Sequence, residues 1–136
     1  EYRYPGVPMM ELHSINERPF DIESIRFISI RCYHHKLPVL GFRVGDLTYI
    51  TDTNYIPENE MKKLEGSRIL IINALRKEKH LSHFNLEQAL EIIEKINPEK
   101  AFLTHASHSF GKHGDIQNEL PENVFMAYDG LSLTLK

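Results

Sequence analysis

Histidine and aspartate residues follow four successive predicted strands, each at the point where its strand ends. These residues are His34, His35, Asp52, His80, His83, His105 and His108. Loops at one edge of a sheet can bring such separated side chains together. Imidazole and carboxylate groups in combination suit Zn²⁺, Mn²⁺ or Fe²⁺. The pattern therefore predicts a metal site at one edge of a sheet.

Simpler interpretations of the same residues stay open from the spacing alone. A single histidine in a loop is usually just hydrated, and Asp52 could serve as a turn former with Thr53 and Asn54. If the backbone is extended, the rings of His34 and His35 point to opposite sides, so at most one of them is a ligand. The chain has no His-x-Glu-x-x-His, cysteine-pair or Gly-x-Ser-x-Gly motif that would predict a rival chemistry.

Hydrophobic patterning predicts the elements that must position these residues. We expect strands over 9–15, 25–32, 39–44, 47–51, 68–73, 101–104, 124–127 and 131–135, and helices over 57–64 and 86–96. Gly45 and Asp46 suit a type II′ turn between the third and fourth strands. Asn85 and Gln88 form a capping-box pattern at the start of the second helix. A hairpin around Asp129 is expected to end the chain, giving an α+β class with α/β-like layers in one unit spanning 1–136.

Composition and charge limit the classes of partner and the cell compartment that we expect for this chain. The 136 residues carry a formal net charge of −3, so no positive field draws the chain to nucleic acid or to an anionic membrane. No apolar run approaches the length of a membrane span, and no secretory signal is visible. The single cysteine cannot form an internal disulfide. We therefore expect a cytoplasmic protein, and the start at Glu1 suggests a fragment.

Several short motifs, in order along the chain, resemble the metallo-β-lactamase superfamily. Residues 34–41, His-His-Lys-Leu-Pro-Val-Leu-Gly, are similar to its third metal motif, and residues 49–52, Tyr-Ile-Thr-Asp, to its fourth. Residues 103–108, Leu-Thr-His-Ala-Ser-His, are similar to the fifth, and residues 128–131 match the closing segment. Residues 82–86, Ser-His-Phe-Asn-Leu, lie where one branch has a catalytic histidine before a helix. That branch is the phosphodiesterases typified by the cyclic ribose phosphate phosphodiesterase of phosphonate breakdown.

The resemblance implies a fold, a cofactor and a role for each residue. The fold would be the C-terminal half of a four-layer αββα sandwich, a mixed sheet with two or three helices. Two divalent metal ions, Zn or Mn, would activate water for attack on a small phosphodiester. The implied roles are metal ligation for His34, Asp52 (as the bridge) and His105, general-acid catalysis or phosphate contact for His83, and substrate binding for His80 and His108.

One motif of the superfamily is absent from the chain. The His-x-His-x-Asp-His motif belongs to the N-terminal half of the fold, and it is not found in the 136 residues. We therefore expect that this chain alone holds metal substoichiometrically and is inactive. Its bare sheet face should pair with the missing N-terminal half or form a homodimer. The alternatives are an RNA-processing nuclease of the same fold, a non-catalytic structural or interaction half-domain, and an unrelated α/β metal-binding domain.

Overall fold

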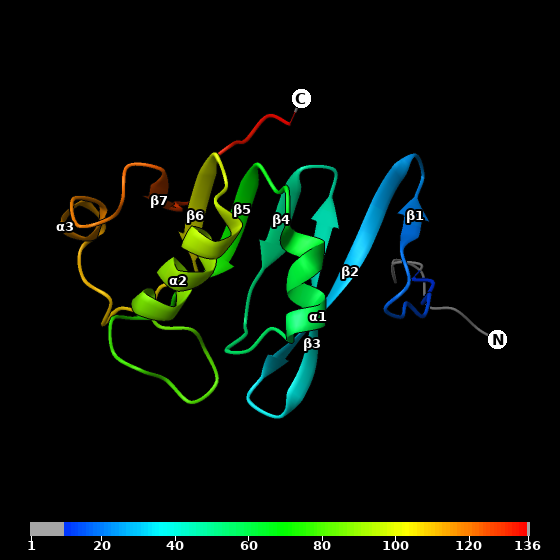
Figure 1. Ribbon diagram of the computed structural model, residues 1–136, viewed down its shortest axis with the longest axis horizontal. Coiled ribbons are helices and arrows are strands. Elements are labelled where there is room, and N and C mark those ends of the chain that lie inside the picture. Colours follow the sequence, from blue (N-terminus) through cyan, green and yellow to red (C-terminus); the bar gives the residue numbers. More distant parts are fainter. Residues whose placement is uncertain (1–9, 136) are drawn as a thin grey trace, which may run out of the picture.

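A seven-stranded sheet, with its strands side by side in chain order, forms the centre of the computed structural model, which describes residues 10–135 (Figure 1). The strands are β1 (Phe20–Ile22), β2 (Ile25–His34), β3 (Leu37–Val44), β4 (Leu47–Ile50), β5 (Ile69–Asn73), β6 (Lys100–Thr104) and β7 (Val124–Met126). The helices are α1 (Glu58–Met61), the 3₁₀ helix η1 (Lys62–Leu64), α2 (Leu86–Ile96) and α3 (His113–Gln117). Pairing is antiparallel from β1 to β4 and parallel from β4 to β7. The mixed sheet with three α-helices confirms the predicted α+β class.

Local sequence signals set several element boundaries as predicted. Gly45 has φ of 57° and Asp46 has no positive φ, the combination that a type II′ turn requires between β3 and β4. The side chain of Asn85 accepts a hydrogen bond from the backbone of Gln88, whose side chain accepts one from the backbone of Asn85. This reciprocal capping box starts α2, and Asn97 ends the helix in the left-handed conformation.

The hydrophobic core lies between one face of the sheet and the helices. Leu70, Ile72 and Leu103 on this face are fully buried and belong to one cluster. The buried apolar residues of all helices in the described part of the chain belong to the same cluster. Figure 1 shows α1 and α2 on the same side of the sheet. The helices therefore cover one face of the sheet.

The opposite face carries a continuous row of large apolar side chains. Cross-strand pairing aligns Phe42 with Tyr49, Tyr49 with Ile71, Ile71 with Phe102, and Phe102 with Phe125. Paired residues point to the same face of a sheet, so the row crosses five strands. Tyr49 is 42% exposed, whereas Phe102 is buried at 6% exposure, and none of the five belongs to the core cluster. This face has the composition of a surface that meets another layer.

Side chains of α1 and η1 occupy the open edge of β2. The backbone N–H of Arg31 donates to the Glu60 carboxylate at 2.7 Å, and the carbonyl of Ser29 accepts from Lys63 at 2.9 Å. Glu60 is buried and forms an ion pair with Lys63 at 2.7 Å. These bonds satisfy edge groups that would otherwise offer a template for another strand.

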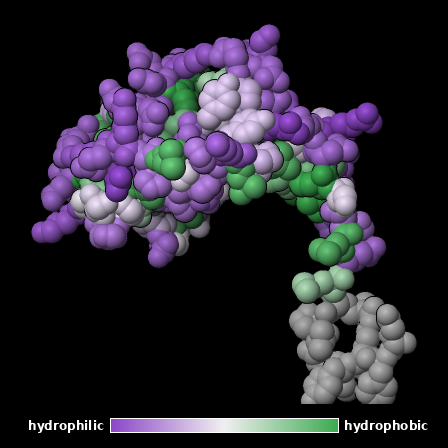
Figure 2. All heavy atoms as spheres, turned by 90° about the horizontal axis from the view of Figure 1, so that it is seen from below, coloured by the Kyte–Doolittle hydropathy of each residue, from purple (hydrophilic) through white to green (hydrophobic). Residues whose placement is uncertain are grey.

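The N-terminal end of the described chain projects from the main body, with apolar side chains along it (Figure 2). The short strand β1 contributes Phe20, whose ring stacks on Phe27 at 5.3 Å between centroids and meets Phe42 edge-on. Ile22 and Ile25 on this ribbon are about half exposed. The described part of the chain therefore has an exposed apolar surface at this end.

Two expected strands are wrong and two elements were not expected. Residues 10–15 form no strand (residue 9 lies outside the described range), and neither do residues 131–135. β7 pairs in parallel with β6, so the expected closing hairpin is absent, and residues 131–133 instead line a cavity beside Phe102 and Phe125. A segment with alternating apolar residues forms a strand only where the edge of another strand is free to pair with it. β1 and α3 were missed because three and five residues carry too little periodicity to detect.

No helix in residues 10–135 is long and apolar enough to cross a membrane.

Candidate metal centre

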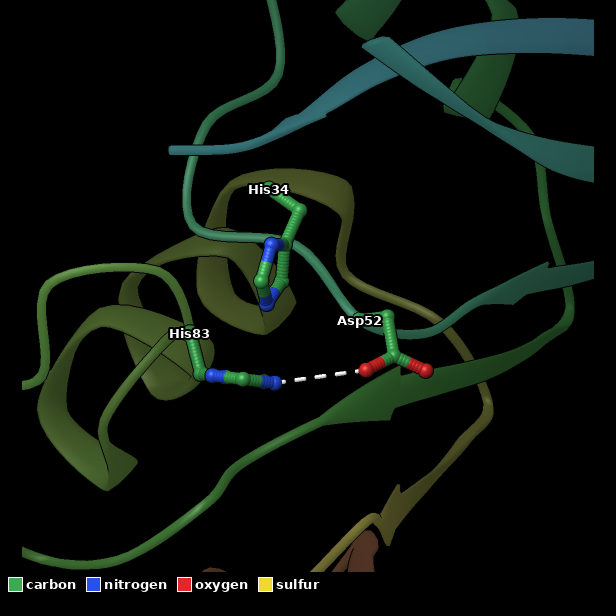
Figure 3. Close-up of side chains that lie close together, drawn as sticks. All are labelled: His34, Asp52 and His83. Carbon is green, nitrogen blue, oxygen red and sulfur yellow. Dashed lines mark hydrogen bonds and ion pairs between the residues drawn. The ribbon is translucent and has the colours of Figure 1, made fainter. Parts of the chain in front are cut away.

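Four predicted site residues come together where the carboxyl ends of the strands meet. His34 is the last residue of β2, and Asp52 lies just beyond the end of β4. His83 lies in the loop between β5 and α2, and His105 directly follows β6. Figure 3 shows His34, Asp52 and His83 converging from three separate segments of the chain.

Short distances join these four side chains. Oδ1 of Asp52 lies 3.3 Å from Nε2 of His83 and 3.3 Å from Nε2 of His105. The ring of His83 meets that of His34 edge-on at 4.7 Å and stacks on that of His105 at 4.9 Å between centroids. One ligand atom from each of His34, Asp52 and His83 lies within 4.8 Å of the others. His83 thus contacts each of the other three residues, and Asp52 contacts both His83 and His105.

The backbone at this edge is held in an uncommon conformation. Asp52 and His105 have φ of 54° and 60°, and His35 has φ of 56°. Left-handed backbone at residues other than glycine costs free energy and persists where the surroundings impose it. Such residues often gather at functional sites. Asp52 and His105 are therefore aimed into the site by strained turns, whereas His34 is aimed by the end of β2.

A close approach between β3 and β4 explains one glycine of the motif at residues 34–41. A Cβ atom on Gly41 would lie 2.9 Å from the side chain of Ile50 and 3.0 Å from the carbonyl oxygen of Tyr49. Only glycine allows β3 to pack at this distance from the strand that leads to Asp52.

His83 is the most enclosed of the four groups, with 12% of its side chain exposed. Burial lowers the pKa of its imidazole, and the nearby rings of His105, His34 and His80 lower it further. The hydrogen bond with Asp52 acts in the opposite direction and raises the pKa. Net lowering favours the neutral ring at neutral pH, the form that binds a metal or exchanges a proton.

His80 and Ser82 hold the other nitrogen of the His83 ring. Nδ1 of His83 lies 3.1 Å from Nδ1 of His80 and 3.0 Å from the hydroxyl oxygen of Ser82. If His80 carries the shared proton, Nε2 of His83 donates to Asp52; if His83 carries it, Nε2 presents a lone pair. The predicted substrate contact of His80 stays a prediction, and its position against His83 fits an orienting role.

The remaining histidines lie outside this group. His108 is exposed and forms no hydrogen bond among the residues that the structure describes. The backbone N–H of His35 donates to Asn54 at 2.7 Å, while its side chain is exposed. His13 is exposed beside Glu11, and His113 approaches the carbonyl oxygen of Met126 at 3.3 Å. The substrate-binding role of His108 stays a prediction.

The residues present fit a divalent metal ion. The cluster offers imidazole nitrogens and a carboxylate oxygen, which are the donors that Zn²⁺ and Mn²⁺ accept. The ligand assignment of His34, Asp52 and His105, and the catalytic assignment of His83, stay predictions.

Two buried polar residues behind the site were not predicted. Thr53 and Asn73 are fully buried, and their hydrogen bonds tie the loop of Asp52 to the end of β5. Asn73 had a detectable signal, because an amide directly follows the apolar run Ile-Leu-Ile-Ile. Thr53 had none, since threonine after aspartate is common in any turn.

Comparison with known proteins shows a family match and a curated relative. The model of the Beta-lactamase superfamily domain matches residues 2–106. A curated relative, an octanoyltransferase from Porphyromonas gingivalis, is 34% identical over 130 residues, which is 94% of this chain and 26% of that protein.

Solved structures with the same fold extend the comparison. The chain is similar to a diphosphatase of the PhnP family, with a TM-score of 0.90 and 31% identity, over 93% of this chain and 49% of that one. Human tRNase Z, short form, matches with a TM-score of 0.68 and 18% identity, over 88% of this chain and 48% of that one. The chain thus spans about half the length of these structures and about a quarter of the curated relative.

Proposed function

The chain belongs to the metallo-β-lactamase superfamily of hydrolases, and from this premise we propose that the full-length protein is a metal-dependent phosphodiesterase or diphosphatase. The observation that carries the proposal is a cluster at the carboxyl edge of the sheet, in which His83 and His105 lie against one carboxylate oxygen of Asp52 and His34 lies against His83. The similarity to a diphosphatase at 31% identity supports phosphoryl chemistry over other hydrolyses.

His34, Asp52 and His105 are the residues of this chain that would hold two divalent ions, Zn or Mn, in the full-length protein. When bound, such ions lower the pKa of water and offset charge on phosphoryl oxygens. Asp52 suits the shared position because its carboxylate has two oxygens and already contacts histidines from two different loops. The left-handed turns at Asp52 and His105 aim both side chains before any ligand arrives.

His83 would supply the proton that the leaving oxygen needs. Its Nε2 faces the site beside Asp52, while its Nδ1 contacts His80 and Ser82. Hydrolysis breaks the P–O bond to the leaving group, and the departing oxygen takes up a proton as it gains charge. A ring with one nitrogen fixed from behind can present the other in a constant direction.

The missing half of the fold is the partner that we propose for the opposite face of the sheet. The apolar row from Phe42 to Phe125 crosses five strands outside the helix-covered core. The chain also spans only 49% of the diphosphatase to which it is similar. A second layer would bury the part of this row that is still exposed, such as Tyr49, and would carry the His-x-His-x-Asp-His motif that completes the metal ligands.

Acyl transfer is not part of the proposal. The curated octanoyltransferase shares only 26% of its length with this chain, so its name describes a much larger protein. The single cysteine, Cys32, is fully buried, and burial raises the pKa of its thiol to about 12. A thiol in this state is a poor nucleophile.

A substrate comparison with the full-length protein tests the proposal. We expect hydrolysis of bis(p-nitrophenyl) phosphate and of a nucleoside diphosphate ester, and no processing of a tRNA precursor. Processing of the precursor with neither small substrate turned over would favour the nuclease alternative. No hydrolysis of any of the three by metal-loaded protein would favour a structural or interaction role.

A further inference from the structure

Thr53 bonds to backbone groups that adjoin three residues of the metal centre. Its carbonyl oxygen accepts from the N–H of Phe84 at 2.8 Å, and Phe84 directly follows His83. Its hydroxyl donates to the carbonyl of Tyr33 at 2.8 Å and accepts from the N–H of Tyr33 at 3.2 Å, and Tyr33 directly precedes His34. Thr53 itself directly follows Asp52. One fully buried residue thus connects the three segments that Figure 3 shows converging.

Asn73 fixes the backbone of Thr53 from the opposite side. Its Oδ1 accepts from the N–H of Thr53 at 3.2 Å, and its Nδ2 donates to the Thr53 carbonyl at 3.0 Å. The N–H of the next residue, Ala74, donates to the carbonyl of Thr104 at 3.0 Å, and Thr104 directly precedes His105. The connection therefore reaches the fourth segment of the site as well.

The burial of Thr53 and Asn73 carries a desolvation cost that the folding of the sheet does not require. Two polar side chains are removed from water at the end of strands that also bury apolar residues such as Ile50 and Ile72. All their partners adjoin the segments that carry His34, Asp52, His83 and His105. The left-handed backbone of Asp52 also needs support from its surroundings, and the next residue receives it.

We propose that Thr53, held by Asn73, is a positioning residue that keeps the loops of His34, Asp52 and His83 in the relative arrangement that binds metal. It contacts neither metal nor substrate and acts through the backbone of its neighbours. The inference rests on the proposed function only for its metal readout. Its structural readout, the mutual approach of the histidine rings, stands without any metal.

The chain offers matched variants for the test. Thr53→Val removes the hydroxyl at nearly constant volume, and Thr53→Ser keeps it. Thr48→Val is the control, because Thr48 is also fully buried in the same stretch of chain, with its hydroxyl 2.7 Å from that of Ser67 and not bonded to any loop of the site.

Two measurements on the full-length protein follow. Nuclear Overhauser contacts between the rings of His34 and His83 and between those of His83 and His105 are recorded in the metal-free state. Zn²⁺ affinity is then measured by competition with a chromogenic chelator. We expect Thr53→Val to lose the ring contacts and to weaken Zn²⁺ binding by about 10–100-fold, the range for groups that orient metal ligands. Thr53→Ser should retain both properties, as should Thr48→Val even if it melts earlier.

The outcomes separate this inference from the proposed function. If Thr53→Val keeps the ring contacts, or if Thr48→Val loses as much as Thr53→Val, the positioning role is overturned. If wild-type protein binds no Zn²⁺ or Mn²⁺ but Thr53→Val still loses the ring contacts, the positioning role holds and the metal-dependent function fails.

Discussion

Nε2 of His83 lies 3.3 Å from Oδ1 of Asp52, and the same carboxylate oxygen lies 3.3 Å from Nε2 of His105. One aspartate therefore stands between a largely enclosed histidine and a more exposed one, with side-chain exposures of 12% and 37%. The enclosed ring is oriented from behind by His80, whereas the exposed one follows a strand directly. The difference in surroundings is the basis for giving the two histidines different roles, proton donor and metal ligand.

Replacing Asp52 with asparagine should reduce both metal content and turnover. The variant keeps the side-chain shape but removes the charge that attracts two cations, so we expect activity to fall by at least about 100-fold, beyond the usual effect of losing an orienting group. Elemental analysis and diester hydrolysis measure the two effects. Asp21→Asn is the control, since Asp21 pairs with Arg26 on the surface of β1. Full metal content in Asp52→Asn would remove Asp52 from the ligand set.

Replacing His83 with alanine should slow turnover according to the leaving group. Loss of a general acid costs about 10²–10⁴-fold in rate. The loss should be large for an alkyl phosphodiester and small for a p-nitrophenyl ester, because nitrophenolate leaves without protonation. Metal content should stay close to that of the wild type, as should both rates in the exposed control His13→Ala. If the rates for both substrates fell equally and the metal content fell as well, His83 would instead be a metal ligand. Its ligand atom lies within 4.8 Å of those of His34 and Asp52, which allows that role.

Stability of the metal-free protein should fall as the pH falls below neutrality. Burial and neighbouring imidazoles lower the pKa of His83 from 6.5, so between the lowered value and 6.5 the unfolded chain binds more protons than the folded one. Stability therefore decreases as the pH drops through that window. Urea unfolding at pH 7.5 and pH 5.5 measures this decrease, which should be smaller in His83→Gln. An identical decrease in stability in the wild type and in His83→Gln would mean that titratable groups other than His83 cause it.

Replacing Glu60 with alanine should destabilise the fold. The change removes the acceptor of the Arg31 N–H and the carboxylate partner of Lys63, which keeps only its hydrogen bond to the Ser29 carbonyl. Removing one member of a buried pair costs about 3–5 kcal/mol, and the lower end applies here because Lys63 retains 28% exposure. Glu58→Ala in the same helix removes an exposed pair with Lys95 and should cost about 0–1 kcal/mol. Equal unfolding midpoints for Glu60→Ala and Glu58→Ala would refute the stabilising role of Glu60 at the edge of β2.

Elements with their own local signals could be predicted from the sequence. Asn85 and Gln88 marked the start of α2, and Gly45 marked the turn between β3 and β4, because each meets a requirement of backbone geometry within a few residues. The strand expected over 131–135 failed for the opposite reason. Its alternation of leucine and polar residues is real, but a strand needs a partner edge, and pairing depends on the rest of the sheet.

The membership of the site could be predicted better than its geometry. Each of His34, Asp52 and His105 ends or follows a strand, so the carboxyl edge of the sheet brought them together as expected. The placement of His80 behind His83 depends on how an irregular loop folds, which periodicity does not encode. The roles of Thr53 and Asn73 depend on contacts between distant segments, and their residue types alone do not indicate them.

Metal removal and restoration in the full-length protein test the central claim most directly. The protein is stripped with a chelator, its metal content is measured, and hydrolysis of bis(p-nitrophenyl) phosphate is followed as Zn²⁺ or Mn²⁺ is added back, with Asp52→Asn in parallel. We predict that activity disappears with the metal and returns on its addition in the wild type, and that it does not return in Asp52→Asn. Undiminished hydrolysis by metal-free protein, or full restoration in Asp52→Asn, would contradict a metal-dependent hydrolase built around this carboxylate.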